Sequence, residues 1–446
     1  MENEITKIFK IIKNRKFKGY TGLAVKNSIY QFGTTISAKI GALLFTIILA
    51  RILMPELFGL YSLALATIVL LATVADFGIQ QSLIRFVSQN LSRKKEKRAK
   101  SYTKYFFKLR IILAFSVAML LAIFSKIIAN NYYNQPISLA LIAGSFYILS
   151  ITFIYFVESL FQSTNKFKYP FFKEIFFQGL RLILIPLVIL SLLKYGFSDE
   201  NILFFIFLSL AFTYFLTLIF IFLFMRKHIS FLKSESEELT KKEKKDVIKF
   251  ILPLSATVFS GAFFGYIDII MLGKFVASEF IGYYRVAFSL ISSAIHIINF
   301  SFVLFPLFSR LKGGRLERAL KKTITVSLGI SSLAVIGTII LAPLVISLVF
   351  GKEYSNATVI LQILALLLIS GPLTATYTSY LISKGKPKMV AKLLIYSTVI
   401  NIILNYIFIT WFLSYSQFLA VIGATIATII SRYFYLATLI YFKKKY

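Results

Sequence analysis

Long apolar runs dominate this sequence and restrict what it can fold into. The hydrocarbon core of a bilayer is about 30 Å thick, so a spanning helix needs about 20 mostly apolar residues. A membrane β-barrel would instead show alternating strands of about ten residues. The sequence therefore predicts an all-α polytopic membrane protein with 12 transmembrane helices. The runs cover approximately residues 29–50, 57–79, 105–129, 137–160, 171–193, 202–225, 250–272, 284–308, 323–350, 356–383, 390–413 and 419–441.

The basic residues are concentrated in alternate loops, and they give the chain a formal net charge of +32. Because cytoplasmic loops are enriched in Lys and Arg, this pattern predicts a multi-pass protein of the cell (inner or plasma) membrane with both termini in the cytoplasm. Topology and anionic membrane lipids explain the charge without a nucleic acid partner. The basic clusters lie at residues 93–98, 166–168, 226–249, 310–322, 384–388 and 443–445.

Several classes of chemistry find no support in the sequence. The chain has no Cys, which excludes disulfides, thiolate metal sites and Cys nucleophiles. It shows no P-loop, nucleotide-sugar domain or metal-ligand cluster. We therefore expect no cofactor, no metal and no catalytic residue. The segment before the first span is basic and lacks a separate apolar stretch, which argues against a cleavable signal peptide.

One partly charged phrase occurs twice, first as "ILARILMPELFGLYSLA" and again as "MLGKFVASEFIGYYRVA". Gly59 aligns with Gly282 and Tyr61 with Tyr284, so the second copy follows the first by half the length of the chain. Each phrase lies at the predicted turn between two spans. We expect the glycines to permit a tight turn and the tyrosines to lie at the membrane interface.

A second, weaker match pairs "SLFQSTNKFKYP" (159–170) with "SYLISKGKPKMV" (379–390), again separated by about half the chain. Two matches in the same order with nearly the same separation indicate an internal duplication. It divides the chain into an N-terminal six-helix bundle (1–225), a cytoplasmic linker (226–249) and a C-terminal six-helix bundle (250–446). We expect the linker to be a solvated connection.

The even number of spans in each half gives both bundles the same orientation in the membrane. This is a parallel repeat about an axis along the membrane normal, with a central cavity between the bundles. Rocking of the two bundles about that cavity would give alternating access. The architecture alone indicates a transporter and leaves its cargo open.

A series of longer phrases resembles one known family in both content and order. They are "ILARILMPELFGLYSLALA", "DFGIQQSLIRF", "YIDIIMLGKFVASEFIGYYRVA", "VLFPLFSRL", "LVFGKEYSNATVILQILAL", "NIILNYIFI" and "IGATIATIISR". Nearly the whole chain is similar to the polysaccharide (lipid-linked oligosaccharide) flippases of the multidrug/oligosaccharidyl-lipid/polysaccharide exporter superfamily. The lipid II flippase and the multidrug extruders belong to the same superfamily.

The resemblance implies transport of an undecaprenyl- or other polyprenyl-pyrophosphate oligosaccharide from the cytoplasmic to the outer leaflet. Such cargo serves surface polysaccharide biosynthesis, which includes lipopolysaccharide and exopolysaccharide. A polysaccharide polymerase and assembly proteins are implied partners. In the lipid II flippase an Arg occupies the place of Lys39, so the resemblance also implies a cavity role for Lys39.

Two cations lie near the middle of predicted spans, where a charge costs about 2.5–3.5 kcal/mol and usually faces protein or a water-filled cavity. Lys39 lies in the first span. Arg181 lies in the fifth and shares a helical face with Glu174 and Gln178. We expect both cations to line the substrate cavity, where a guanidinium suits a phosphate. The alternatives are a snorkelling Lys39 and a self-contained pair of Arg181 with Glu174.

Three further residues are candidates for ion or proton coupling: Asp76, Asp268 and His296. Asp268 lies deep in the seventh span, where it could also face the substrate cavity. His296 in the eighth span carries a titratable imidazole. Each candidate has a structural alternative, which is a loop anchor for Asp76, an ion pair for Asp268 and simple packing for His296.

A polar stripe on the eleventh span contains Ser397, Asn401 and Asn405, each four residues apart. Asn401 and Asn405 are candidates for sugar contact in the substrate cavity, although such stripes also hold helices together. Gly371 and Pro372 are hinge candidates, because proline frees a backbone carbonyl and permits a kink.

Two alternatives to a flippase remain open. A multidrug extruder of the same superfamily shares the architecture, but an organic-cation cargo would favour an acidic cavity, which the sequence does not indicate. A polytopic glycosyltransferase or polymerase would need a sizeable folded loop to hold catalytic groups. The predicted outer loops have about ten residues or fewer, so an enzyme is disfavoured.

Overall fold

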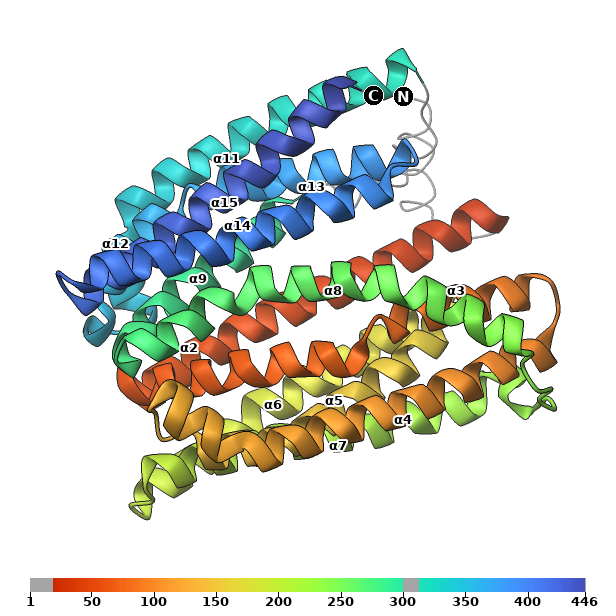
Figure 1. Cartoon of the computed structure of the whole chain (residues 1–446), viewed down its shortest axis with the longest axis horizontal. Helices are drawn as coiled ribbons and strands as arrows, with labels where there is room; N and C mark the ends of the chain where they lie inside the picture. The colour runs from red at the N-terminus through yellow and green to blue at the C-terminus, as the bar shows by residue number, and fades with distance from the viewer. Residues whose placement is uncertain (1–18, 300–312, 446) are drawn as a thin grey trace.

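Every secondary-structure element in the described part of the chain is helical (Figure 1). The computed structural model describes residues 19–299 and 313–445. Because lipid offers no hydrogen-bond partners, a chain this apolar satisfies its backbone groups within helices. The helices are α2 (Gly19–Asp76), α3 (Ile79–Ser92), α4 (Glu96–Lys126), α5 (Ser138–Ser163), α6 (Lys168–Lys194), α7 (Asp199–His228), α8 (Lys241–Phe275), α9 (Ser278–Ile298), α11 (Gly314–Val349), α12 (Ala357–Leu364), α13 (Leu367–Ser383), α14 (Pro387–Leu413) and α15 (Gln417–Lys445), with short segments η1 (Ile127–Tyr133), η2 (Ser230–Lys233) and η3 (Lys352–Tyr354).

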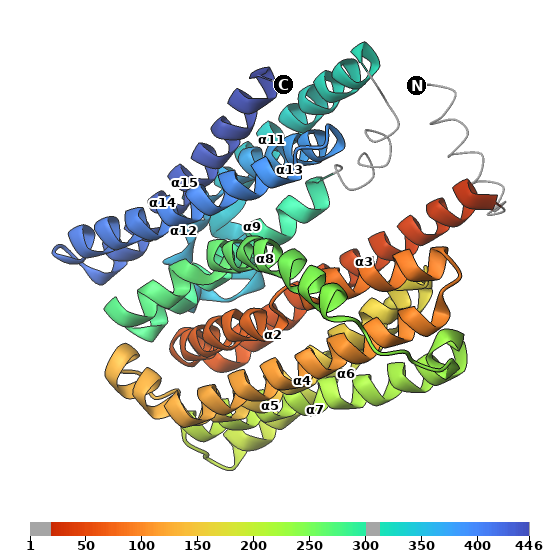
Figure 2. The same cartoon turned by 45° about the vertical axis from the view of Figure 1, so that its right-hand side comes forward.

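Eleven helical segments among the described residues are long and apolar enough to cross a membrane, which confirms an all-helical polytopic membrane protein. One of them, Val25–Ser92, has 68 residues. It includes a bend in α2 at Met54, whose φ of 60° and ψ of 171° are not helical, directly before Pro55. The chain reverses direction there, so the two arms of α2 run beside each other (Figures 1 and 2). The end of the predicted eighth span, 300–308, lies outside the described residues.

The helices form two groups that are most clearly separated in Figure 2. Helices α2 to α7 make up the N-terminal group, and α9 and α11 to α15 make up the C-terminal group, with α8 between them. The basic connections α3–α4, α5–α6, α7–α8 and α13–α14 all lie at the right-hand end in Figure 1. We call this the basic end of the molecule.

The apolar cores of the two groups are shared at one end and separate at the other. The largest cluster of buried side chains combines residues of both groups, including Leu57 and Ile281. A second cluster contains buried residues only between Ile79 and Ile251. A third contains buried residues only between Phe264 and Leu439. The two separate cores adjoin the basic connections, so the groups diverge toward the basic end.

The two copies of the repeated phrase pack against each other at the shared core. Gly59 and Gly282 lie inside helices α2 and α9, so the predicted role of glycine in a tight turn is wrong. A Cβ on Gly59 would lie 1.7 Å from the carbonyl oxygen of Ser278, and one on Gly282 would lie 2.4 Å from that of Pro55. Glycine is needed here because the two backbones touch. We call this contact the glycine seam.

The tyrosines of the phrase are buried, so their predicted place at the membrane interface is also wrong. Tyr61 is 5% exposed and stacks on Phe207 with ring centroids 5.4 Å apart. Tyr284 is 1% exposed and donates a hydrogen bond to Asp268. The shared core excludes both side chains from lipid and water.

Further contacts between the groups lie beside the glycine seam. The Nε of Arg51, in α2, donates to the carbonyl oxygen of Val349 at 2.8 Å. The hydroxyl of buried Tyr354 donates to the carbonyl oxygen of Ala50 at 2.9 Å. The groups are thus closed on each other at the end opposite the basic connections.

The linker is more ordered than the solvated connection predicted for residues 226–249. Both ends of this range are helical, in α7 and α8. Between them, Ile229, Phe231 and Leu239 are buried in the same cluster as α3, α4 and α5. Apolar anchors of this kind hold the segment on the N-terminal group.

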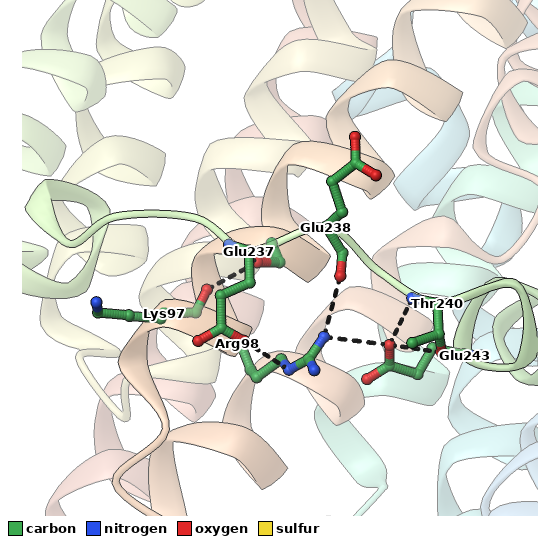
Figure 3. Close-up of polar contacts among 7 residues, drawn as sticks. Lys97, Arg98, Glu237, Glu238, Thr240 and Glu243 are labelled. Carbon is green, nitrogen blue, oxygen red and sulfur yellow. Dashed lines mark hydrogen bonds and ion pairs between the residues drawn. The ribbon is translucent and has the colours of Figure 1, made fainter.

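Polar contacts also fasten the linker to the start of α4 (Figure 3). The guanidinium of Arg98 lies 2.9 Å from Glu237 Oε2 and 3.2 Å from Glu243 Oε2, and it donates to the carbonyl oxygen of Glu238 at 3.1 Å. Thr240 and Glu243 form a reciprocal capping box at the first turn of α8. The entry into α8 is therefore fixed relative to α4.

Candidate functional site

A cavity of about 640 Å³ lies between the first arm of α2 and the C-terminal group. Its described lining comes from α2, α8, α9, α13, α14 and α15. This volume falls within the range of about 300–1,000 Å³ that is typical of small-molecule sites. It is large enough for a headgroup and much smaller than a whole lipid-linked glycan.

The lining of this cavity is basic. Lys39, Arg285, Arg432 and His296 contribute to it, and no Asp or Glu does among the described residues. Within the described residues, none of these four side chains forms an ion pair with a carboxylate. Low-dielectric walls focus the field of unpaired charges and attract ions of the opposite sign. The cavity is therefore suited to an anion.

Lys39 faces the cavity because another side of the same helix packs tightly on α6. A Cβ on Gly41 would lie 2.4 Å from Gln178 Oε1, and one on Gly33 would lie 2.9 Å from the ring of Phe171. These glycines let the first arm of α2 approach α6 closely. The first arm of α2 thus separates the cavity from the core of the N-terminal group.

Helix α9 contributes Arg285 and His296 to the opposite wall. Both side chains are half-buried. The imidazole Nδ1 of His296 lies 2.6 Å from the carbonyl oxygen of Ser292, one turn earlier in the helix. His296 therefore lines the cavity, and its role in proton coupling stays a prediction.

Arg432 is held in place against α8. Its guanidinium carbon lies 3.6 Å from the ring centroid of Phe264, and Nη2 donates to the carbonyl oxygen of the same residue. Both Arg432 and Phe264 line the cavity. Stacking and a backbone hydrogen bond orient this cation without neutralising it.

Asp268 lies behind the cavity lining and is only 3% exposed. Its carboxylate accepts hydrogen bonds from the Tyr284 hydroxyl at 2.6 Å, the Thr428 hydroxyl at 2.7 Å and the Asn405 side-chain amide at 2.8 Å. These donors are all neutral. The ion pair considered for Asp268 is not present within the described residues.

Two buried side-chain oxygens, on Asn405 and on Asn401 one helical turn before it, lack partners within the described residues. Asn401 donates to Ser431 Oγ at 2.9 Å, but Asn401 Oδ1 and Asn405 Oδ1 are buried without a hydrogen-bond partner in the described residues. Unsatisfied buried acceptors are costly. Carboxylate and amide oxygens are ligands that small hard cations prefer. We call Asp268, Asn401, Asn405 and Thr428 the Asp268 cluster. Neither Asn401 nor Asn405 lines the cavity.

Arg181 does not line this cavity and instead belongs to a network in the N-terminal group. Its Nη2 donates to Gln178 Oε1 at 2.6 Å, and its guanidinium carbon lies 4.4 Å from the ring centroid of Phe45. Gln178 in turn donates to Glu174 Oε1 at 2.6 Å. The helical spacing predicts this shared face.

The same network contains a buried cation between two carboxylates. The Nζ of Lys173 lies 3.2 Å from Glu158 Oε2 and 2.9 Å from Glu174 Oε2. All three residues are buried, with exposures of 4%, 8% and 7%. Buried charges are tolerated when they are paired in this way. This network in the N-terminal group therefore neutralises its own charges.

Asp76 anchors the break between α2 and α3. It forms a buried ion pair with Arg110, and its Oδ2 accepts a hydrogen bond from the backbone N–H of Gly78 at 3.2 Å. Gly78 has a φ of 77°, which glycine adopts at little cost. This geometry matches the loop-anchor alternative for Asp76, whose coupling role stays a prediction.

The hinge candidates Gly371 and Pro372 lie within the unbroken helix α13. Gly371 lines the cavity, and a Cβ there would lie 2.7 Å from the side chain of Ile295 in α9. Thr376 donates to the carbonyl oxygen of Pro372 at 2.9 Å. Hinge motion at this pair stays a prediction.

Sequence reasoning missed four charged residues that organise the two groups. Arg110, Lys173, Arg285 and Arg432 each lie within a predicted apolar span. The rule that identified Lys39, namely that a charge inside a span faces protein or a cavity, applies equally to them. Arg432 is the clearest case, since it lies in the middle of the twelfth run.

Solved structures with the same fold are membrane transporters. The chain is similar to the inward-facing conformation of a multidrug resistance MATE family transporter of the MOP superfamily, with a TM-score of 0.70 and 15% identity over 93% of this chain and 99% of the other. It is also similar to the lipid II flippase MurJ in an inward closed conformation, with a TM-score of 0.67 and 19% identity over 92% and 87% of the two chains. The chain shares the fold of these two proteins.

Two archaeal relatives match by sequence. An uncharacterised membrane protein of Methanocaldococcus jannaschii is 25% identical over 418 residues, which cover 91% of this chain and 94% of the relative. A protein of Haloferax volcanii named as a probable low-salt glycan biosynthesis flippase is 27% identical over 178 residues, or 38% of this chain and 36% of the relative. The model of the family described as polysaccharide biosynthesis protein matches residues 24–312. The chain belongs to this family.

Proposed function

We propose that this protein flips a polyprenyl-pyrophosphate-linked oligosaccharide from the cytoplasmic to the outer leaflet for surface polysaccharide biosynthesis. The pyrophosphate enters the basic cavity while the lipid tail stays between helices in the bilayer, and no bond is made or broken. One observation carries this proposal: Lys39, Arg285 and Arg432 line a cavity to which the described residues contribute no acid. Coulomb attraction to a pyrophosphate is stronger between low-dielectric protein walls than in bulk water.

We further propose that the chain crosses the membrane 12 times as two six-helix bundles, residues 1–225 and 250–446, with both termini in the cytoplasm. The bent segment Val25–Ser92 supports two crossings. At about 1.5 Å per residue, 68 helical residues extend about 100 Å, against a hydrocarbon core of about 30 Å. The grouping of basic connections at one end supports a cytoplasmic basic end.

The cavity is proposed to work by alternating access. The groups touch at the glycine seam and diverge toward the basic end, which corresponds to a state open to the cytoplasm. The likeness to an inward-facing transporter supports the same assignment. Export then requires the seam to open while the basic end closes.

A small cation bound at the Asp268 cluster is proposed to couple to this motion. The cluster offers one carboxylate and the side-chain oxygens of Asn401 and Asn405, which accept no hydrogen bond within the described residues. One negative charge matches a monovalent ion such as Na⁺. The cluster ties α8 to α14 and α15, so an ion there would act on the helices that carry the cavity wall.

The test is flipping of a polyprenyl-pyrophosphate oligosaccharide by protein reconstituted in vesicles. We expect Lys39→Ala and Arg285→Ala each to lower the initial rate by about 10- to 100-fold, since a hydrogen bond to a charged group is worth about 1.5–3 kcal/mol. The matched control is Lys388→Ala, which removes an exposed basic residue on α14. Wild-type rates from both cavity variants would refute the role of these cations.

A multidrug extruder is the other function that this fold supports. The same vesicles distinguish it, because an extruder would accumulate a fluorescent organic cation and leave the lipid-linked oligosaccharide in its original leaflet. We expect the opposite result. A cationic lining repels such a cargo.

A further inference from the structure

Two hydrogen bonds, one helical turn apart, join α8 to α15, and we call them the two rungs of this interface. In the first, Thr428 of α15 donates to Asp268 of α8 at 2.7 Å. In the second, Arg432 donates to the carbonyl oxygen of Phe264. Residues four apart lie on the same face of a helix, so both rungs belong to one interface. One end of this interface is the Asp268 cluster, and the other end is the cavity wall.

Arg432 is therefore the cavity cation most directly connected to the cluster. It lines the cavity, yet it is one turn from Thr428 on its own helix, and it contacts the residue one turn before Asp268 on α8. Lys39 lies across the cavity on α2. Arg285 follows Tyr284, which donates to Asp268, but no hydrogen bond joins Arg285 itself to α8 or α15 within the described chain.

The charge balance at this interface changes with the occupancy of the cluster. Within the described residues Asp268 has only neutral hydrogen-bond donors, so its negative charge also acts on the guanidinium of Arg432, which contacts α8 one turn away. A monovalent cation in the cluster would neutralise that charge. Arg432 would then present its full positive charge to the cavity.

We propose that Arg432 binds the anionic headgroup of the cargo and that its strength as an anion ligand is set by cation occupancy of the Asp268 cluster. This inference rests on the proposed function. It adds the residue that binds the headgroup and the direction of the coupling, in which a bound cation strengthens headgroup binding. Cation and headgroup bind cooperatively, and linkage requires that each raises the affinity for the other by the same factor.

The test measures equilibrium binding of polyprenyl pyrophosphate to the purified protein in nanodiscs, with NaCl replaced by choline chloride at constant ionic strength. Wild-type protein is expected to bind about tenfold more tightly in Na⁺, within the usual range of coupling between sites. Arg432→Gln is expected to bind more weakly in Na⁺ and to show no dependence on Na⁺. Arg432→Lys retains the charge and is expected to restore part of the dependence.

Two further variants separate this role from general attraction or loss of structure. Arg285→Ala is expected to weaken binding while keeping the dependence on Na⁺, because it leaves the α8–α15 interface intact. Asp268→Asn is expected to bind equally with and without Na⁺. Lys388→Gln, the control for net charge, is expected to behave like wild type.

The outcomes of this measurement distinguish a failure of the proposed function from a failure of the role of Arg432. If wild-type protein does not bind polyprenyl pyrophosphate at all, the proposed function fails and the inference fails with it. If wild-type protein binds without any dependence on Na⁺, or if Arg432→Gln keeps the wild-type dependence, only the role of Arg432 is overturned.

Discussion

The two groups of helices treat their buried charges in opposite ways. In the N-terminal group, Glu158 and Glu174 share Lys173, and Asp76 pairs with Arg110. Where α8 packs on the C-terminal group, Asp268 has only neutral donors within the described residues. The cavity cations Arg285 and Arg432 there face no carboxylate partner in the described lining.

These two arrangements of charge have different physical consequences. Charges that neutralise one another hold helices together but have nothing left to offer a ligand. Charges without a partner cost stability and attract ligands. The paired charges of the N-terminal group hold its helices together, whereas the cations that line the cavity come from α9, α15 and the first arm of α2.

The largest expected effect is on the stability of the N-terminal network. Lys173→Met leaves two buried carboxylates without their cation, and breaking a buried pair typically costs about 3–5 kcal/mol. Asp268→Asn removes a charge that has no ion partner, so we expect a much smaller loss of stability and a loss of transport. Thermal unfolding in detergent and flipping in vesicles check both variants. A stable Lys173→Met protein beside an unfolded Asp268→Asn protein would reverse the comparison.

A double-mutant cycle at Asp76 and Arg110 sharpens the same contrast. Either Asp76→Asn or Arg110→Gln alone strands one buried charge, and we expect the double variant to be less destabilised than the sum of the two singles. Contacting residues commonly show interaction energies of about 0.5–3 kcal/mol. Unfolding midpoints of the four proteins give this energy. Strict additivity would mean that the pair does not act as a unit.

The glycine seam supplies a test of closure between the groups. Gly282→Ala would place a Cβ 2.4 Å from the carbonyl oxygen of Pro55 and push the groups apart. Since the chain has no Cys, a single cysteine at the cavity residue Ser289 reports accessibility cleanly. We expect labelling by a membrane-impermeant maleimide from outside to rise several-fold. The control is Gly179→Ala, where a Cβ would meet nothing within 4 Å. Equal labelling in both backgrounds would count against the seam as the outer closure.

The smallest effect is expected at the exposed linker, where Lys97 donates to Glu235 at 2.7 Å. This hydrogen bond raises the pKa of Lys97 and lowers the pKa of Glu235 from their usual values of 10.5 and 4.5. The contact is present between those two values. It is lost as pH falls through the lowered pKa of Glu235 or rises through the raised pKa of Lys97.

A spin label on Lys233→Cys measures this effect. We expect its mobility to rise slightly when the pH falls below 4.5, and the change to be absent in Glu235→Gln. The rise stays small because Ile229, Phe231 and Leu239 keep the linker anchored. A large release of the segment at low pH would mean that the polar contacts, and not the apolar ones, hold it.

Much of the fold could be predicted from apolar periodicity alone, because lipid allows the backbone few choices. The site could be predicted less well. A charge in the middle of a span predicts a cavity residue, and this rule identifies Lys39. The same rule selects Arg181, but the guanidinium of Arg181 is hydrogen-bonded to Gln178 within the N-terminal group. Whether a cation finds a carboxylate partner depends on packing between helices far apart in the sequence. Arg432, for example, meets the backbone carbonyl of Phe264 and not a carboxylate.

The repeated phrase illustrates the same limit. Its glycines and tyrosines suggest a turn at the membrane surface, a local interpretation that the structure corrects. Gly59 and Gly282 are required by a contact between two helices that lie half a chain apart in the sequence. Tyr284 is required by a buried carboxylate. Sequence spacing reveals the repeated phrase, and only the tertiary structure reveals that its two copies meet.

The most direct test of the basic cavity compares two lipids of equal chain length, one with and one without the anionic pyrophosphate. Purified wild-type protein and the Lys39→Ala/Arg285→Ala double variant are titrated with polyprenyl pyrophosphate and with the uncharged polyprenol of equal chain length. We expect wild-type protein to prefer the pyrophosphate by about 100-fold or more, since two charged contacts are worth about 3–6 kcal/mol together, and the double variant to lose most of that preference. Equal affinity of wild-type protein for both lipids, or an unchanged preference in the double variant, would contradict a cavity built for a phosphate-bearing cargo.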